Sequence, residues 1–164
     1  MNMSTKILVA LALVIVAGVG YYGISPLFNN VRADDPLPPG ATSGASMPGT
    51  ATSTTEMMGT LSAPVKGTFA HPASGTVRLV ESVGKTYVRY ENFKTINGPD
   101  IFVYLATDTS ANDFVNLGAV KATEGNINYE VPPGTDLAKY HYVLTWCRQF
   151  SVLFNSADLA QQGT

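Results

Sequence analysis

The hydrophobic and polar positions divide the chain into three parts. The first part is an apolar run over 7–27, which follows Lys6 and contains no charged residue. A helix of about 20 apolar residues is long enough to cross the hydrocarbon core of a bilayer. Tyr21 and Tyr22 suit the membrane interface, where the ring stays apolar and the hydroxyl meets water. We therefore predict a transmembrane signal anchor over 7–27.

The charges that flank this run predict its orientation. Lys6 precedes the run and Asp34 follows it, so the positive-inside rule places residues 1–6 in the cytoplasm and the remainder outside a single-pass cell membrane protein. The alternative is a signal peptide, cleaved at a weak site near Gly18 or Gly20, which would leave a secreted protein. Both interpretations export the rest of the chain.

The second part, 28–63, is rich in Pro, Ser, Thr and Gly and poor in large apolar residues. Such a segment buries too little apolar surface to offset its ordering entropy, so we predict a disordered or semi-extended linker. Its Ser and Thr residues are also possible acceptors of O-linked sugars. Met47, Met57 and Met58 lie in it without repeated spacing, which favours scattered methionines over a copper site.

The third part, 64–160, alternates apolar and polar residues in short runs separated by turn signals, and 161–164 forms a tail. The runs are rich in Val, Ile, Tyr, Phe and Thr, as half-buried strands are. No segment after the anchor keeps a helical period over three turns. We therefore predict an all-β domain, an antiparallel β-sandwich or open barrel. The expected strands are Val65–Phe69, Thr76–Glu81, Thr86–Glu91, Ile101–Ala106, Phe114–Lys121, Asn126–Val131, Tyr142–Trp146 and Gln149–Phe154.

Two positions show where strands should end. Ser82-Val83-Gly84-Lys85 reads as a hairpin turn with a glycine. Near the C-terminus, Trp146, Phe150 and Val152 share one parity, and Arg148 falls among them. Because successive strand side chains point to opposite faces, this charged residue indicates a strand end or hairpin beside Cys147.

Composition excludes several classes of protein. The chain has 164 residues, a net charge of -2, one cysteine and two histidines. A near-neutral charge argues against nucleic acid as a partner. A single cysteine excludes an internal disulfide framework and multi-cysteine metal sites. The sequence contains no hydrolase or transferase motif such as Gly-x-Ser-x-Gly or His-Glu-x-x-His, and whether it is an enzyme stays open.

Several separated motifs resemble one known family. They are Asn92–Leu105, Leu117-Gly118, Tyr129-Glu130-Val131-Pro132 and Trp146–Phe154, together with Gly67, Phe69, His71 and Ser74-Gly75. In this order they resemble the DM-thirteen domain family, also called the electron-transfer DM domain, over about 65–159. The resemblance implies a β-sandwich-like extracellular domain. It also implies a redox role that depends largely on a family cysteine, which corresponds here to Cys147.

Cys147 is the first candidate for chemistry. A thiol does redox work when it can form a thiolate and be reached, and the neighbouring Arg148 is the candidate to stabilise that thiolate. Because the chain has no second cysteine, a disulfide cycle needs a thiol from a partner. The alternative is an inert, buried thiol that packs beside Trp146.

The two histidines are weak metal candidates. A blue-copper site needs two histidines, a cysteine and usually an axial methionine, and neither His nor Met follows Cys147. His141 lies six residues before Cys147, about 20 Å along an extended strand. We expect His141 to be a strand-edge residue and His71 a turn residue, and we assign no cofactor.

Asn97-Gly98-Pro99-Asp100 is the second candidate. Gly98 supplies unusual backbone angles for a tight turn, and Pro99 fixes its own. Asp100 then accepts turn amides or faces a cleft, so the segment forms either a turn or a ligand site. One carboxylate does not make a calcium loop.

Two functions remain open from the sequence. One is a membrane-tethered extracytoplasmic redox or electron-transfer module, centred on Cys147 and acting with a redox or envelope protein. The other is a non-catalytic binding or surface-interaction module. Its contact residues would be sought among Tyr87, Tyr90, Tyr104, Tyr140 and Tyr142.

Overall fold

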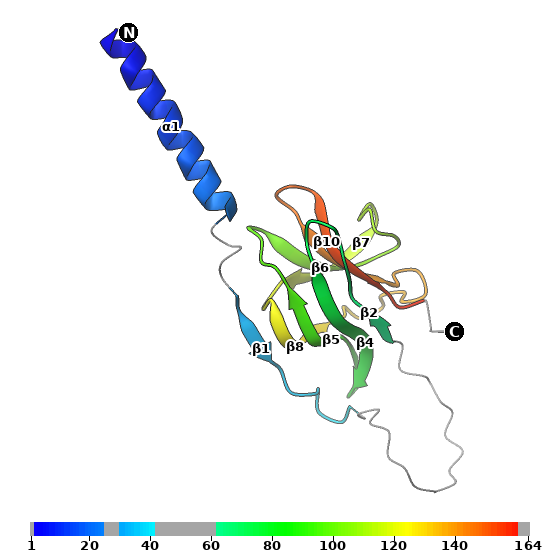
Figure 1. Ribbon diagram of the computed structural model, residues 1–164. Helices are drawn as coiled ribbons and strands as arrows, with labels where there is room; N and C mark the ends of the chain where they lie inside the picture. The colour runs from blue at the N-terminus through cyan, green and yellow to red at the C-terminus, as the bar shows by residue number, and fades with distance from the viewer. Residues whose placement is uncertain (1, 25–29, 42–61, 161–164) are drawn as a thin grey trace, which may run out of the picture.

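The computed structural model describes residues 2–24, 30–41 and 62–160 (Figure 1). Its first element is the helix α1, Met3–Ile24. Over the described residues, this is the one helix whose length and composition would let it cross a membrane, and its apolar span is not buried against the rest of the chain. Such a helix is a signal anchor or a signal sequence. Residues 25–27 of the expected span lie outside the described residues.

The rest of the described chain forms two five-stranded sheets packed as a sandwich, which confirms the predicted fold class. The first sheet has the order β1-β8-β5-β4-β2, and the second has the order β3-β10-β9-β6-β7. The strands are β1 Arg32–Asp34, β2 Ser62–Pro64, β3 Lys66–Gly67, β4 Ala73–Ser82, β5 Lys85–Thr95, β6 Ile101–Ala106, β7 Phe114–Ala119, β8 Glu124–Glu130, β9 Tyr142–Cys147 and β10 Val152–Asp158.

The predicted turns lie where strands reverse. Between β4 and β5, Val83 and Gly84 both have positive φ, 47° and 73°, as a two-residue hairpin turn of the primed type requires. Between β9 and β10, Cys147 pairs with Val152 and residues 148–151 form the connection. Strand β9 therefore ends immediately before Arg148, where the break in parity indicates.

Two strands come from the range that the sequence assigns to the linker. β1 pairs in parallel with β8, with Ala33 opposite Gly125, and β2 pairs with β4. They are the two edge strands of the first sheet. Neither strand is long enough to show alternation, so the pattern cannot identify them. The middle of that range, 42–61 with its three methionines, lies outside the described residues.

The segment that contains β1 is held by specific contacts. Gly125 has φ 110°, and a Cβ at this position would lie 1.9 Å from the Ala33 carbonyl oxygen, so only glycine allows β1 to approach β8. The buried Arg89 donates hydrogen bonds to the carbonyl oxygens of Asp35 and Pro36, at 3.1 and 3.4 Å. It also donates to Asn128 Oδ1 at 2.8 Å. Residues 32–36 are therefore part of the folded domain.

The core lies between the sheets and is built from the inward positions of both. Its fully buried side chains include Val77, Val88, Tyr90, Val103, Leu105, Ile127, Tyr129 and Val143.

The sandwich has two ends, which differ in the segments that form them. We call one of them the entry end: four strands begin there, β1, β6, β8 and β10, and β9 ends there. The loop 68–72 and the turns 96–100 and 148–151 lie at this end. The chain arrives there from α1: the Thr123 amide donates to the Val31 carbonyl at 2.7 Å. Figure 1 shows the β9–β10 turn at the upper end of the sandwich, on the side from which the chain leaves α1. The opposite end, with the 82–85 turn, is the far end.

Candidate functional site

Cys147 lies in the core at the entry end. It is the last residue of β9 and has 0% of its surface exposed. Its side chain belongs to a small buried cluster with Ile101 and Phe154. Trp146 packs instead with Tyr104 in a separate cluster, because neighbouring strand residues face opposite sides. The thiol is therefore free but enclosed by apolar groups.

Arg148 and Asp100, which the sequence places in two separate candidate groups, meet in the structure. The guanidinium donates from Nε to Asp100 Oδ2 at 3.1 Å and from Nη2 to Oδ1 at 3.2 Å. Its Cζ also lies 3.7 Å from the centroid of the Phe102 ring. The hydrogen bond to Asp100 raises the pKa of Arg148. This bidentate pair, which we call the 148–100 clamp, ties the β9–β10 turn to the turn before β6.

The turn at 97–100 covers the cysteine cluster. Asn97 Oδ1 accepts a hydrogen bond from the Gly98 amide at 2.9 Å, as a local turn contact does. Gly98 lacks the positive φ that Gly84 and Gly134 have in their turns, so a left-handed backbone is not the reason for glycine at this position. A Cβ on Gly98 would lie 2.8 Å from the Phe154 ring and 2.9 Å from Ile101. Glycine is needed there for space against the ring that packs on Cys147.

The two histidines lie at opposite ends of β10. The His71 ring stacks on Phe154 with centroids 3.9 Å apart, and burial lowers the pKa of His71. His141 lies 2.8 Å from Asp158 at the far end. Burial alone would raise the pKa of Asp158, but the hydrogen bond from His141 and other contacts outweigh it, so this pKa is lowered. Across the described residues, no three His, Cys, Asp or Glu side chains are grouped to hold a metal.

Burial also separates the aromatic residues that the sequence offers as a binding face. Tyr90 and Tyr104 are buried, whereas Tyr87, Tyr140 and Tyr142 are half-buried. Within the sandwich, Phe114 at the start of β7 is 41% exposed. Phe69 and Phe150, in the 68–72 loop and the 148–151 turn, are more exposed still. Their exposure follows from their place in these connections, which the alternation of the sequence does not identify.

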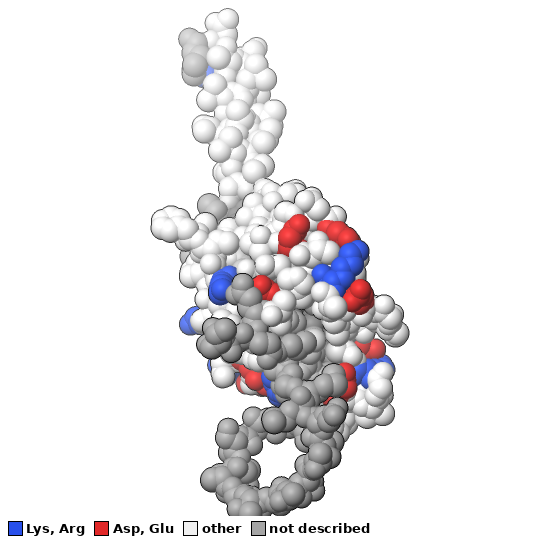
Figure 2. Space-filling view, turned by 90° about the vertical axis from the view of Figure 1, so that its right-hand side faces the viewer, with Lys and Arg blue, Asp and Glu red and all other residues white. Residues whose placement is uncertain are grey.

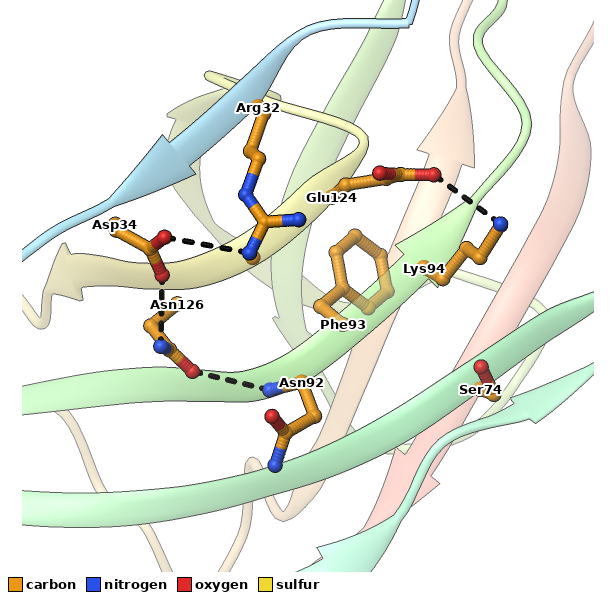
Figure 3. A pocket seen from close by; sticks show the side chains of 9 residues that line it. Arg32, Asp34, Ser74, Asn92, Phe93, Lys94, Glu124 and Asn126 are labelled. Atoms are coloured by element: carbon orange, nitrogen blue, oxygen red, sulfur yellow. Dashed lines mark hydrogen bonds and ion pairs between the residues drawn. The ribbon is translucent and has the colours of Figure 1, made fainter.

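A polar pocket of about 330 Å³ lies beside β1, where it meets β5 and β8 (Figure 3). Asp34 Oδ1 accepts a hydrogen bond from Asn126 Nδ2 at 2.8 Å, and Asn126 Oδ1 accepts one from the Asn92 amide at 3.0 Å. An ion pair between Lys94 and Glu124, at 3.2 Å, lies on the opposite side of the pocket. The lining therefore offers charges of both signs and suits a small polar ligand.

The sequence gives no sign of this pocket. It joins a strand of the expected linker to residues about 90 positions later, as the contact between Asp34 and Asn126 shows. The pocket exists only because β1 adds to the edge of the first sheet.

The fold and these residues define a class of protein: a β-sandwich domain with one enclosed thiol, preceded by an apolar helix. The family described as Electron transfer DM13 matches residues 67–159, which is more than half of the chain. The chain therefore belongs to the DM13 electron-transfer family. No curated protein and no solved structure matches it. The matched range begins after β1 and β2, so both edge strands of the first sheet come from outside it.

Proposed function

We propose that the chain is a membrane-anchored, extracytoplasmic redox module in which Cys147 is the reactive group. One observation carries this proposal: in a domain of the electron-transfer family, the only cysteine lies in the core directly beside the 148–151 turn. That turn is tied down by the half-exposed 148–100 clamp. A thiol in this position is protected while the turn is closed and accessible when it opens.

The reaction follows from the chain's own residues. When the turn opens, the Cys147 thiolate attacks a disulfide of a partner protein, forms a mixed disulfide and releases the partner's other sulfur as a thiolate. Because the chain has no second cysteine, a further thiol must resolve this bond. Arg148, once released from Asp100, is the adjacent cation that stabilises the Cys147 thiolate.

The membrane anchor is the second part of the proposal. A signal anchor keeps α1 in the bilayer with residues 1–6 in the cytoplasm, and a cleaved signal sequence would remove it. Intact mass of the protein extracted from the membrane fraction separates the two cases. A mass that includes α1 supports the anchor, and a shortened protein in the soluble fraction contradicts it.

The redox proposal is tested by the rate of thiol labelling of the full chain in detergent, read by intact mass. We expect the native protein to react slowly and Asp100→Asn to react several-fold faster, because this substitution weakens the clamp, lets the turn open more often and keeps Arg148 beside the thiol. Asp113→Asn is the matched control, because it weakens the ion pair between Asp113 and Lys139, which are each 50% exposed, close to the 49% of Arg148. This control should leave the rate unchanged.

Cys147→Ser completes the test. It should fold, because the side chain changes little in size, and it should lose both the adduct and any oxidant-dependent change of the wild-type protein. Redox behaviour that persists in Cys147→Ser contradicts the proposal. Labelling that occurs only on global unfolding, at the same rate in Asp100→Asn, identifies Cys147 as a packing residue.

The pocket beside β1 supports a second candidate, a non-catalytic binding module. Its lining carries Arg32 and Lys94 together with Asp34 and Glu124, so a zwitterion such as a free amino acid matches both signs. Titration with glycine, followed by the side-chain amide signals of Asn92 and Asn126 in NMR spectra, tests this. Saturable shifts that disappear in Asp34→Asn support the candidate, and unchanged signals exclude this ligand.

A further inference from the structure

The path of the chain limits how far the sandwich can lie from α1. α1 ends at Ile24 and β1 begins at Arg32, eight residues later. Even fully extended, eight residues span at most about 29 Å. Because β1 begins at the entry end, this end is the one that the chain holds nearest to α1. A linker placed after β1 cannot increase that distance while β1 stays paired with β8.

The entry end also exposes large apolar side chains in two separate connections. Phe69 is fully exposed in the 68–72 loop. In the β9–β10 connection, Phe150 is 59% exposed and Val152 is 37% exposed. A phenylalanine ring in water forgoes the hydrophobic stabilisation that burial would provide. Two such rings at the tips of neighbouring loops indicate a surface that meets an apolar environment.

The charges around these loops favour a lipid surface. Lys66 is exposed in β3, next to the 68–72 loop, whereas Lys94, near the end of β5, is exposed but paired with Glu124. Basic residues next to a bilayer are attracted to lipid phosphates. Figure 2 shows that, on the face it presents, the atoms of the sandwich directly below α1 are white, and that acidic and basic side chains begin a short way below them.

We propose that the entry end lies on the surface of the bilayer that holds α1, with the Phe69 and Phe150 rings inserted among the lipid headgroups and upper acyl chains. The rings would enter to the depth of about 5–10 Å at which interfacial apolar side chains lie. This inference rests on the proposed membrane anchor. It goes further by fixing which end of the domain faces the lipid.

The test uses the full chain in nanodiscs of brominated phosphatidylcholine, whose bromine atoms quench nearby tryptophan fluorescence. Phe69→Trp and Phe150→Trp each replace one ring by another, and Trp146, common to all variants, sets the baseline. Val83→Trp is the matched control, because Val83 is an 86% exposed apolar residue at the tip of the far-end turn. We expect strong quenching of the added fluorescence in the first two variants and none in Val83→Trp.

A second measurement needs no substitution. The wild-type chain is irradiated in nanodiscs that contain a phosphatidylcholine with a diazirine near its headgroup. We expect lipid adducts in 66–72 and 148–152 and none in 82–85. Equal quenching at all three tips, or adducts without preference for the entry end, overturns the proposed contact.

Failure of the contact and failure of the anchor give different results. If α1 is cleaved and the protein leaves the membrane fraction, both proposals fall. If the full chain stays in the membrane but Phe69→Trp and Phe150→Trp behave like Val83→Trp, only the lipid contact is wrong.

Discussion

The two ends of the sandwich are made of similar short connections but differ in what these connections contact. At the entry end, the 97–100 turn covers the ring of Phe154, and Phe154 packs on Cys147. At the far end, the Ser82 hydroxyl donates to the Pro39 carbonyl oxygen, but the tip of the 82–85 turn is open, because a Cβ on Gly84 would meet no atom within 4 Å. A substitution in an entry-end turn should therefore disturb the packing of the core, whereas a substitution at the tip of the far-end turn should change only the turn itself.

The largest difference in stability is expected between alanine substitutions at two glycines with positive φ, Gly125 and Gly84. Gly125→Ala adds a Cβ against the Ala33 carbonyl as well as backbone strain, so β1 must move away from β8. We expect a loss of roughly 3 kcal/mol or more. Gly84→Ala adds strain in open space and should cost about 1–2 kcal/mol. Urea unfolding measures both, and equal losses would contradict the proposed difference.

Hydrogen exchange adds a second readout for Gly125→Ala. Displacement of β1 should increase exchange of the Asp35 and Asn128 amides, which donate to Asn126 O and to Asp35 Oδ2 at 2.8 and 2.9 Å. In Gly84→Ala these amides should stay protected.

Gly98→Ala tests the contact between the entry-end turn and the cysteine cluster. The added methyl presses on the Phe154 ring and should cost about 1–3 kcal/mol, as overpacking of a core does. It should also increase the rate at which Cys147 is labelled in the native protein. Gly134→Ala, at an open far-end turn with φ 80°, is the control for the labelling rate. An unchanged rate in Gly98→Ala would show that this turn does not control access to the thiol.

The smallest expected effect is a dependence of stability on pH at the entry end. Burial lowers the pKa of His71 in the folded state, so below about pH 6.5 the unfolded chain binds more protons than the folded one. Stability should be highest above that pH and fall as the pH decreases toward the lowered pKa. Urea midpoints across this range measure the slope.

Two variants show which histidine causes the dependence of stability on pH. His71→Gln should flatten it, because the titrating ring on Phe154 is gone. His141→Gln removes the histidine at the far end and should leave the His71 contribution in place. A slope that survives His71→Gln unchanged would assign it to other groups.

The sequence predicts those parts of the molecule whose cause is local. The apolar run gives α1, alternation gives the central strands, and Val83-Gly84 gives a hairpin turn because both residues adopt the required φ. The end of β9 is also predicted locally, because Arg148 interrupts the alternation of apolar and polar residues. The family and the candidate Cys147 also follow from motifs that are continuous in sequence.

The tertiary structure alone decides how separated segments meet. β1 forms because β8 has a free edge and Gly125 lets the backbone of Ala33 approach it. The three residues of β1 contain no pattern that would predict this pairing. The same holds for Arg148, whose neighbour in sequence is Cys147 but whose partner in space is Asp100. Strand alternation sends adjacent side chains to opposite faces, so the thiol enters the core and the guanidinium reaches the surface. Local patterns fix secondary structure, whereas burial and pairing depend on which faces the sheets bring together.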